Sequence, residues 1–420
     1  MTRLATLLLA LLLVSPFPAA AQSLAVVHAR AWTLAGDRPI EDATIVVEQG
    51  RVRSVMASGT PPAGMPVIDA KGQPVTPGLF NAATQLGLVE VSSAPDTVDS
   101  RARGEQFGAA FDVSLALNGH SQPVALARSD GITGATSYPG LSGVAPFSGL
   151  AAQIRLREGV DILDRASVAL FVSIGGSGNA GQGSRAIQWQ SLRAALDEVR
   201  NPPPVELRTV SVADAGALRR VLARTLPLAI TTHRESDILQ AIRLAGDYNV
   251  RVILVGGSEA WRVADRLAAA DIPVILDPLE NLPATFDRLG ARQDSAALLR
   301  RAGVRIAFGN VGGPISFTYN AGIALRESAG IAVVNGLSWV EALRAITVEP
   351  RAIFAQGGGK LVPGNPADMV VWDGDPLELS SAPIRVWIDG VEQPLENHQT
   401  RLRERYRTLD TSQLPHAYRP

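Results

Sequence analysis

The chain has 420 residues, of which 46% are hydrophobic and 19% are charged, and its formal net charge is -1 at pH 7. It can bury a large core but is long for one single-core domain, so we expect a globular protein with at least two structural units. The balanced charge excludes the basic surplus that drives phosphate-backbone binding, so we expect no nucleic-acid partner. Cysteine is absent, which excludes thiolate nucleophiles, iron–sulfur ligation and disulfides.

The first 21 residues have the pattern of a cleavable secretory signal. Arg3 precedes an apolar run from Leu7 to Val14, and the segment ends in three alanines at Ala21. The run is shorter than the roughly 20 apolar residues that a membrane-spanning helix needs. We therefore expect cleavage after Ala21, a periplasmic or secreted product, and no membrane anchor.

Strand patterns at both ends of the mature chain predict one small β-sandwich module. Residues 24–72 alternate apolar and polar side chains, which is typical of antiparallel strands. Residues 358–373 and 384–388 return to the same pattern. We predict a module formed by residues 22–74 plus 351–395, followed by a polar tail over residues 396–420.

Between these ends, residues 75–350 alternate short apolar runs with Gly/Ser/Thr-rich loops and segments of helical period, which favours βα units. Eight strands are predicted, over residues 75–79, 132–138, 152–157, 168–174, 228–232, 251–255, 273–276 and 304–308. This count predicts an α/β fold with a (β/α)8 TIM-type barrel, imperfect over residues 139–151, where little room is left for a helix. Helix starts are expected at Ser236 and at Ser338, where Glu341 completes a capping box.

Two motifs bracket the predicted strands. The stretch Asp69–Gln85, DAKGQPVTPGLFNAATQ, resembles the entry motif PGxIDxHxH of the amidohydrolase superfamily, and Gly359–Val371, GKLVPGNPADMVV, resembles its closing signature G-x-L-x-x-G-x-x-A-D. The similarity runs from about Leu24 to Val391. It implies a metal-dependent hydrolase of the imidazolonepropionase-like kind, acting on non-peptide C–N bonds.

The resemblance also implies zinc or another divalent metal, held at the C-terminal ends of the strands to activate water. The superfamily has six metal-ligand positions, two in HxH and one each after the fourth, fifth, sixth and eighth strands. Five of the six are lost here. The departures are Ala83 and Gln85 at HxH, Gly175–Gly178, Gly256–Gly257, and Val311 in place of the metal-binding Asp. Only His233 matches, and because stable sites need three or more protein ligands, we predict no metal cofactor.

His233 is the candidate catalytic residue. A residual general base, a lone metal ligand and a polar residue at the barrel mouth stay open as its roles. Gln85, Glu235 and Asn310 lie at predicted strand ends and are expected to contact a small-molecule ligand, although Glu235 has helix capping as an alternative role. Asp277 and Glu259 are further candidate pocket acids.

Two other patterns carry less chemistry. Residues 176–181 match GxGxxG, but the acidic residue beyond them, Asp197, lies in a predicted helix, so we interpret the glycines as a flexible βα loop. The histidines outside the barrel motifs show no metal-binding spacing and are predicted to be surface or structural residues; they are His28, His120, His398 and His416.

Three functions follow from these observations. The first is an exported hydrolase with an altered site around His233. The second, which the ligand count favours, is a catalytically degenerate barrel that binds a small molecule or a protein partner at its mouth. The third is a subunit that packs on a catalytically complete paralogue or on copies of itself.

Overall fold

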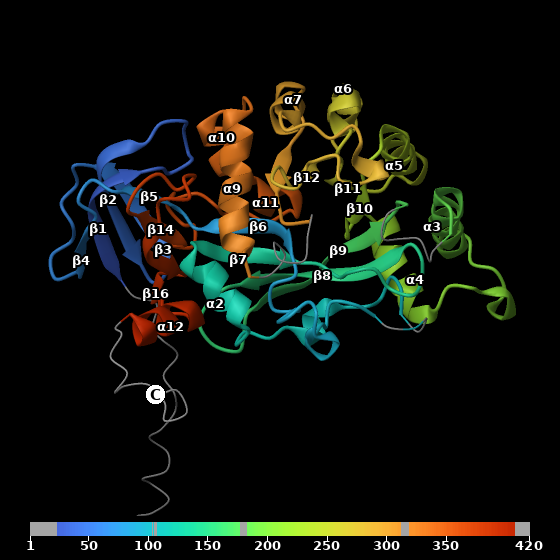
Figure 1. Ribbon diagram of the computed structural model, residues 1–420, viewed down its shortest axis with the longest axis horizontal. Helices are drawn as coiled ribbons and strands as arrows, with labels where there is room; N and C mark the ends of the chain where they lie inside the picture. The colour runs from blue at the N-terminus through green and yellow to red at the C-terminus, as the bar shows by residue number, and fades with distance from the viewer. Residues whose placement is uncertain (1–22, 103, 105–106, 177–182, 312–318, 408–420) are drawn as a thin grey trace, which may run out of the picture.

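The computed structural model of the protein describes residues 23–102, 104, 107–176, 183–311 and 319–407. The expected signal sequence, most of the GxGxxG segment and His416 lie outside these residues. The described chain forms two eight-stranded sheets, one in a module at one end of the molecule and one in a barrel beside it (Figure 1). Among the described residues, no helix has both the length and the apolar character to cross a membrane.

The module sheet joins both ends of the chain. Its order is β16-β15-β14-β5-β1-β2-β3, with β4 paired to β1. The strands are β1 (Leu24–Ala31), β2 (Ile40–Glu48), β3 (Arg51–Ala57), β4 (Val67–Asp69), β5 (Pro74–Pro77), β14 (Met369–Trp372), β15 (Pro383–Ile388) and β16 (Val391–Gln393). β14 pairs antiparallel with β5, which connects the two chain ends, and the inner face buries its own apolar cluster around Ile45, Val75 and Trp387.

The barrel sheet has the order β13-β12-β11-β10-β9-β8-β7-β6. Its strands are β6 (Leu79–Thr84), β7 (Ile132–Ser137), β8 (Phe147–Arg155), β9 (Leu163–Ser173), β10 (Leu228–Thr232), β11 (Val252–Gly256), β12 (Val274–Leu276) and β13 (Ile306–Phe308). The two outer strands approach each other where the amide of Asn310 donates to the carbonyl of Ala83 at 2.8 Å. The α/β class and the TIM-type barrel with a composite β-sandwich are therefore confirmed.

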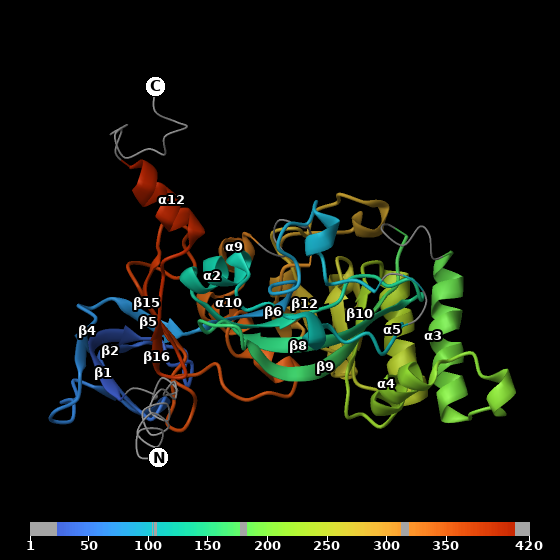
Figure 2. The ribbon, with the colours of Figure 1, turned by 90° about the horizontal axis from the view of Figure 1, so that it is seen from below.

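The prediction that all eight barrel strands are parallel is wrong for one of them. β8 runs antiparallel to both β7 and β9, and no helix lies between these consecutive strands. The long strands β8 and β9 lie side by side in Figure 2. β8 begins at Phe147, inside the segment that was expected to be irregular. A turn is enough to join antiparallel strands, whereas a parallel pair needs a longer crossover.

The first barrel strand was also placed too early. Pro74–Pro77 belongs to the module sheet, and the barrel begins with Leu79–Thr84. Gly78 lies between the two strands, and a Cβ on it would collide with the side chain of Thr133. A glycine therefore allows the chain to pass from one sheet to the other within one residue.

Helices cover the outside of the barrel, with α2, α9 and α10 beside the module and α3 to α7 around the far side (Figure 1). They are α2 (Gln122–Ser129), α3 (Arg185–Arg200), α4 (Val212–Leu222), α5 (Glu235–Tyr248), α6 (Ala264–Ala269), α7 (Ser295–Arg301), α9 (Ala321–Val334), α10 (Trp339–Ala345), α11 (Glu349–Ile353) and α12 (His398–Tyr406). α5 begins at Glu235, one residue earlier than expected. Ser338 accepts from the amide of Glu341, but the predicted capping box is not completed, because the Glu341 carboxylate accepts from the Ser338 hydroxyl instead of the Ser338 amide.

A buried ion cluster connects the barrel to the module. Asp368, in the closing motif, pairs with Arg155 of β8 and, at 3.2 Å, with Arg351 of α11. The Arg351 guanidinium also lies 4.6 Å from the centre of the Phe80 ring. Because these charges are removed from water, loss of one partner leaves an uncompensated buried charge.

Candidate functional site at the barrel mouth

The residues at the expected ligand positions converge on one end of the barrel. Ala83 lies near the end of β6, His233 follows β10, Gly256 ends β11 and Val311 follows β13. The interior just below them is apolar and includes Ala83, Phe171 and Val255, with Val311 packed against it. The parallel strands of a barrel present their C-terminal ends at the same face, where catalytic residues of this architecture lie.

The imidazole of His233 is held in one position. Its Nδ1 shares a hydrogen bond of 2.9 Å with the hydroxyl of Ser258. Gly256 has φ +85°, and a Cβ on it would lie 2.6 Å from Cε1 of His233. The glycine at this lost ligand position therefore makes room for the histidine ring.

The surroundings of His233 keep its ring neutral. Burial, together with the charge of the nearby Arg288 guanidinium, lowers the pKa of His233 from 6.5 to about 3, while Asp287 acts in the opposite direction. Burial of a histidine disfavours its charged form. At neutral pH the ring therefore has one nitrogen that donates and one that accepts, and it is a weak base.

The amide side chains predicted at this mouth have different surroundings. The side chain of Asn310 is fully buried and accepts a hydrogen bond from Nδ2 of Asn81, so it stabilises the join between β13 and β6. Its own Nδ2 has no partner among the described residues. Gln85 is buried directly after β6. Asn81, which replaces the usual Asp of the entry motif, also accepts from the amide of Ala83.

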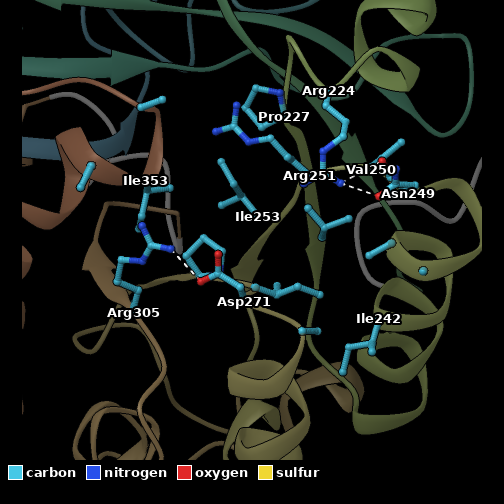
Figure 3. Close-up of a pocket in the computed structure, with 18 residues that line it drawn as sticks. Arg224, Pro227, Ile242, Asn249, Val250, Arg251, Ile253, Asp271, Arg305 and Ile353 are labelled. Atoms are coloured by element: carbon cyan, nitrogen blue, oxygen red, sulfur yellow. Dashed lines mark hydrogen bonds and ion pairs between the residues drawn. The ribbon is translucent and has the colours of Figure 1, made fainter.

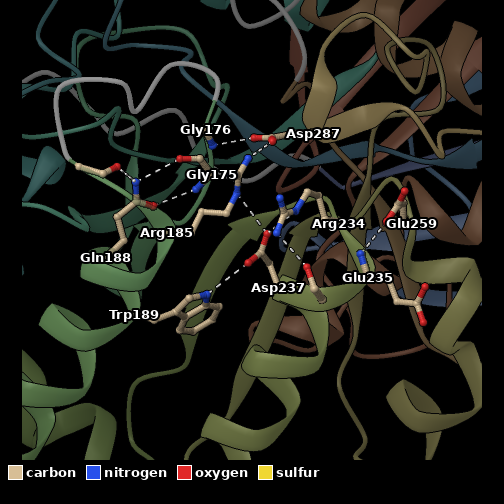
Figure 4. A network of polar contacts seen from close by, with 12 residues as sticks. Gly175, Gly176, Arg185, Gln188, Trp189, Arg234, Glu235, Asp237, Glu259 and Asp287 are labelled. Carbon is tan, nitrogen blue, oxygen red and sulfur yellow. Dashed lines mark hydrogen bonds and ion pairs between the residues drawn. The ribbon is translucent and has the colours of Figure 1, made fainter.

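The acidic residues near the mouth bind backbone groups. Glu235 is the first residue of α5, and its amide donates to the carboxylate of Glu259 at 2.7 Å (Figure 4). Glu259 therefore caps the helix, and Glu235 contributes a negative charge to its first turn. The carboxylate of Asp277 accepts from the amide of Val311 at 2.9 Å and from the hydroxyl of Ser328.

A polar network holds the segment that carries Arg288 close to the barrel. Asp287, in the 3-10 helix η7 (Phe286–Arg288), pairs with Arg185 of α3 and accepts from the amide of Gly176 at 2.7 Å (Figure 4). Arg185 also lies 3.4 Å from Asp237 of α5. The network therefore fixes η7 against two neighbouring βα units.

The sequence did not predict an aromatic pair that lies near the barrel mouth. The rings of Tyr138 and Phe171 stack with 5.2 Å between their centres and 19° between their planes. Burial and the nearby Asp277 carboxylate raise the pKa of Tyr138, while Arg288 lowers it. The charge of Arg288 therefore acts on both His233 and Tyr138. The position of Tyr138 at the end of a predicted strand was the available signal, whereas nothing in the sequence connects Ser258 with His233.

These side chains do not fit the metal that the superfamily implies. Within the described part of the chain, no three His, Cys, Asp or Glu residues lie close enough together to hold a metal ion. The two strand-end segments outside it, 177–182 and 312–318, contain none of these residue types. A catalytic zinc site uses three protein ligands and an open position, so a single imidazole is insufficient.

Comparisons with known proteins agree on the architecture. An amidohydrolase from Thermotoga maritima MSB8 superposes with a TM-score of 0.79 at 22% identity, covering 88% of this chain and 99% of that one. An adenosine deaminase from Xanthomonas campestris with bound zinc gives a TM-score of 0.51 at 16% identity, covering 89% and 93%. The amidohydrolase tasK of Hapsidospora irregularis is 45% identical over 60 residues, which is 14% of this chain and 6% of that protein. No family model matches the chain.

The chain therefore has the fold of these amidohydrolases, a barrel with a composite β-sandwich, as its two motifs predict. At its barrel mouth, His233 is the one match to the six ligand positions that the resemblance implies.

Proposed function

We propose that this protein binds a small planar organic molecule at the barrel mouth and does not perform the metal-assisted hydrolysis of its superfamily. The observation that carries this proposal is the loss of five of six ligand positions, with only His233 retained. A hydrolytic site of this superfamily needs a metal to make hydroxide from water at neutral pH.

The chemistry of the mouth favours a cyclic amide or cyclic urea as the ligand. The half-buried Tyr138 offers an aromatic ring, and the fully buried Phe171 stacks on it and holds it in place. A neutral His233 supplies one hydrogen-bonding nitrogen, since Ser258 occupies the other. Ligand sites commonly combine such apolar walls with a few placed polar groups.

Metal-free hydrolysis with His233 as general base is the competing function. An effective base has a pKa near the working pH, whereas the pKa of His233 is about 3. The ring is therefore a poor acceptor for a proton from water, and the geometry favours binding over hydrolysis.

The test uses hydantoin, a cyclic urea, as the probe. We expect ligand-observed NMR to detect hydantoin binding that weakens in Tyr138→Ala and His233→Ala and persists in a control, Arg266→Gln, on exposed α6. Hydrolysis of hydantoin and of simple dipeptides should not rise on addition of Zn²⁺ or Mn²⁺. Metal-stimulated turnover that disappears in His233→Ala would return the protein to the working hydrolases.

Export is a separate proposal that rests on the sequence alone. The segment ending at Ala21 has the three parts of a secretory signal. N-terminal sequencing of protein recovered from the periplasm should begin at Gln22. Recovery of intact Met1 on a membrane-bound species would contradict it.

Association with copies of the chain or with a catalytically complete paralogue stays a prediction. Light scattering of the purified protein and co-purification from the native host test the two cases.

A further inference from the structure

A cavity lies at the end of the barrel opposite the mouth. It has a volume of about 660 Å³ and is bordered by the residues that directly precede four parallel strands (Figure 3). These residues are Pro227, Arg251, Pro273 and Arg305, before β10, β11, β12 and β13 respectively. The volume falls in the range of small-molecule sites.

The cavity has an excess of positive charge. Its charged lining residues are Arg224, Arg251, Arg305 and Asp271, which give three positive charges against one negative. Arg305 pairs with Asp271 at 2.8 Å, and Arg224 donates to the side chain of Asn249 at 2.8 Å. The guanidinium of Arg251 has no hydrogen-bond or ion-pair partner within the described part of the chain. The cavity therefore presents an uncompensated cation to whatever enters it.

Three residues of the loops that form the cavity have left-handed backbone conformations, in which glycine would be less strained. Arg224, Asn249 and Asp271 have φ values of 61°, 52° and 48°, in the left-handed region. The corresponding residue before β13 is Gly303, with φ 86° and no atom near the place of a Cβ. Left-handed conformations cost free energy for residues with a side chain, least for Asn and Asp. Arg224, its partner Asn249 and the Arg305 partner Asp271 therefore all occupy strained backbone positions.

One wall of the cavity is apolar. Ile253 and Ile353 line it and also belong to the apolar cluster inside the barrel. A bound molecule can therefore place charged groups near the arginines and carbon atoms against these isoleucines. Guanidinium groups bind carboxylate and phosphate oxygens in a bidentate manner, which gives them preference over neutral ligands.

We infer that this cavity is a binding site for a small organic dianion with an apolar part, recognised chiefly by Arg251. The site is independent of the proposed function, since it lies at the other end of the barrel and shares no residue with the mouth. Carboxylate and phosphate head groups offer the same chemistry, and two probes distinguish them.

Calorimetry on the full mature chain with adipate, phenyl phosphate and the neutral adipamide tests this site. We expect adipate or phenyl phosphate to bind and adipamide not to bind. Arg251→Gln should weaken binding about tenfold or more, as loss of a charge-assisted hydrogen bond predicts. Arg251→Lys, which keeps the charge without the planar fork, should give an intermediate loss, and Arg266→Gln should bind like the wild type.

Unfolding midpoints show whether each variant is folded, and the Arg251 side chain makes no hydrogen bond or ion pair with the described residues whose loss would destabilise the chain. The inference is overturned if neither dianion binds to the wild type, or if both bind equally well to Arg251→Gln. Equal binding of adipamide and adipate would also overturn it. None of these results depends on hydantoin binding at the mouth, so the two proposals fail separately.

Discussion

Acidification from pH 7 to pH 5 should destabilise the protein through His233. The folded-state pKa of about 3 lies below the ordinary value of 6.5, so the unfolded chain takes up a proton below pH 6.5 that the folded chain does not. Stability from this group is complete above pH 6.5 and is lost as pH falls toward 3. By proton linkage the loss between pH 7 and 5 is about 2 kcal/mol, an upper bound because the ring is partly exposed.

Urea unfolding of the wild type and of His233→Gln at both pH values measures this loss. Glutamine carries no charge at either pH, while the carboxylates titrate equally in the two proteins, so their difference isolates the histidine. We expect the variant to lose up to about 2 kcal/mol less than the wild type on acidification. His120→Gln, at an exposed histidine, is the matched control and should behave like the wild type. Equal acid sensitivity of His233→Gln and the wild type would refute the reasoning, as would an NMR titration of His233 near pH 6.5.

Two further predictions concern packing and the buried ion cluster. Gly256→Ala should destabilise the protein by about 2 kcal/mol more than Gly303→Ala, because both glycines have φ near 85° but only the first would place a methyl group against His233. In the His233→Ala background this excess should vanish. Persistence of the excess would show that the ring is not the obstacle. Asp368→Asn should cost about 3 to 5 kcal/mol in denaturant unfolding because it leaves the buried Arg351 guanidinium without its carboxylate partner, while Arg155 keeps Asp389. Glu392→Gln, in a half-exposed pair, should cost less than about 1 kcal/mol, and similar costs for the two variants would contradict the structural role of the cluster.

Local patterns predict the strands because burial imposes a period that the sequence displays. The strands β10 to β13 and the closing β14 all lie within apolar runs that are visible without the structure. Strand direction could not be predicted in this way, because Phe147–Arg155 shows the same apolar character whether its neighbours are parallel or antiparallel. The passage through Gly78 is equally hidden, because it depends on Thr133, a residue far away in the chain.

The candidate site was likewise predictable from the sequence only in part. The resemblance locates Ala83, His233 and Val311 at strand ends, since these positions belong to motifs or follow apolar runs. It does not reveal that Ser258 binds the imidazole or that Gly256 accommodates it, because both contacts form only when β10 and β11 lie side by side. The cavity around Arg251 is hidden for the same reason, as its arginines come from separate loops.

Elemental analysis of the mature protein, purified without chelators, tests the central claim most directly. We predict far less than one equivalent of zinc, iron or manganese per chain, and the same value for His233→Ala, because one imidazole cannot supply the three ligands of a catalytic site. About one equivalent of metal in the wild type, lost in His233→Ala, would contradict the account.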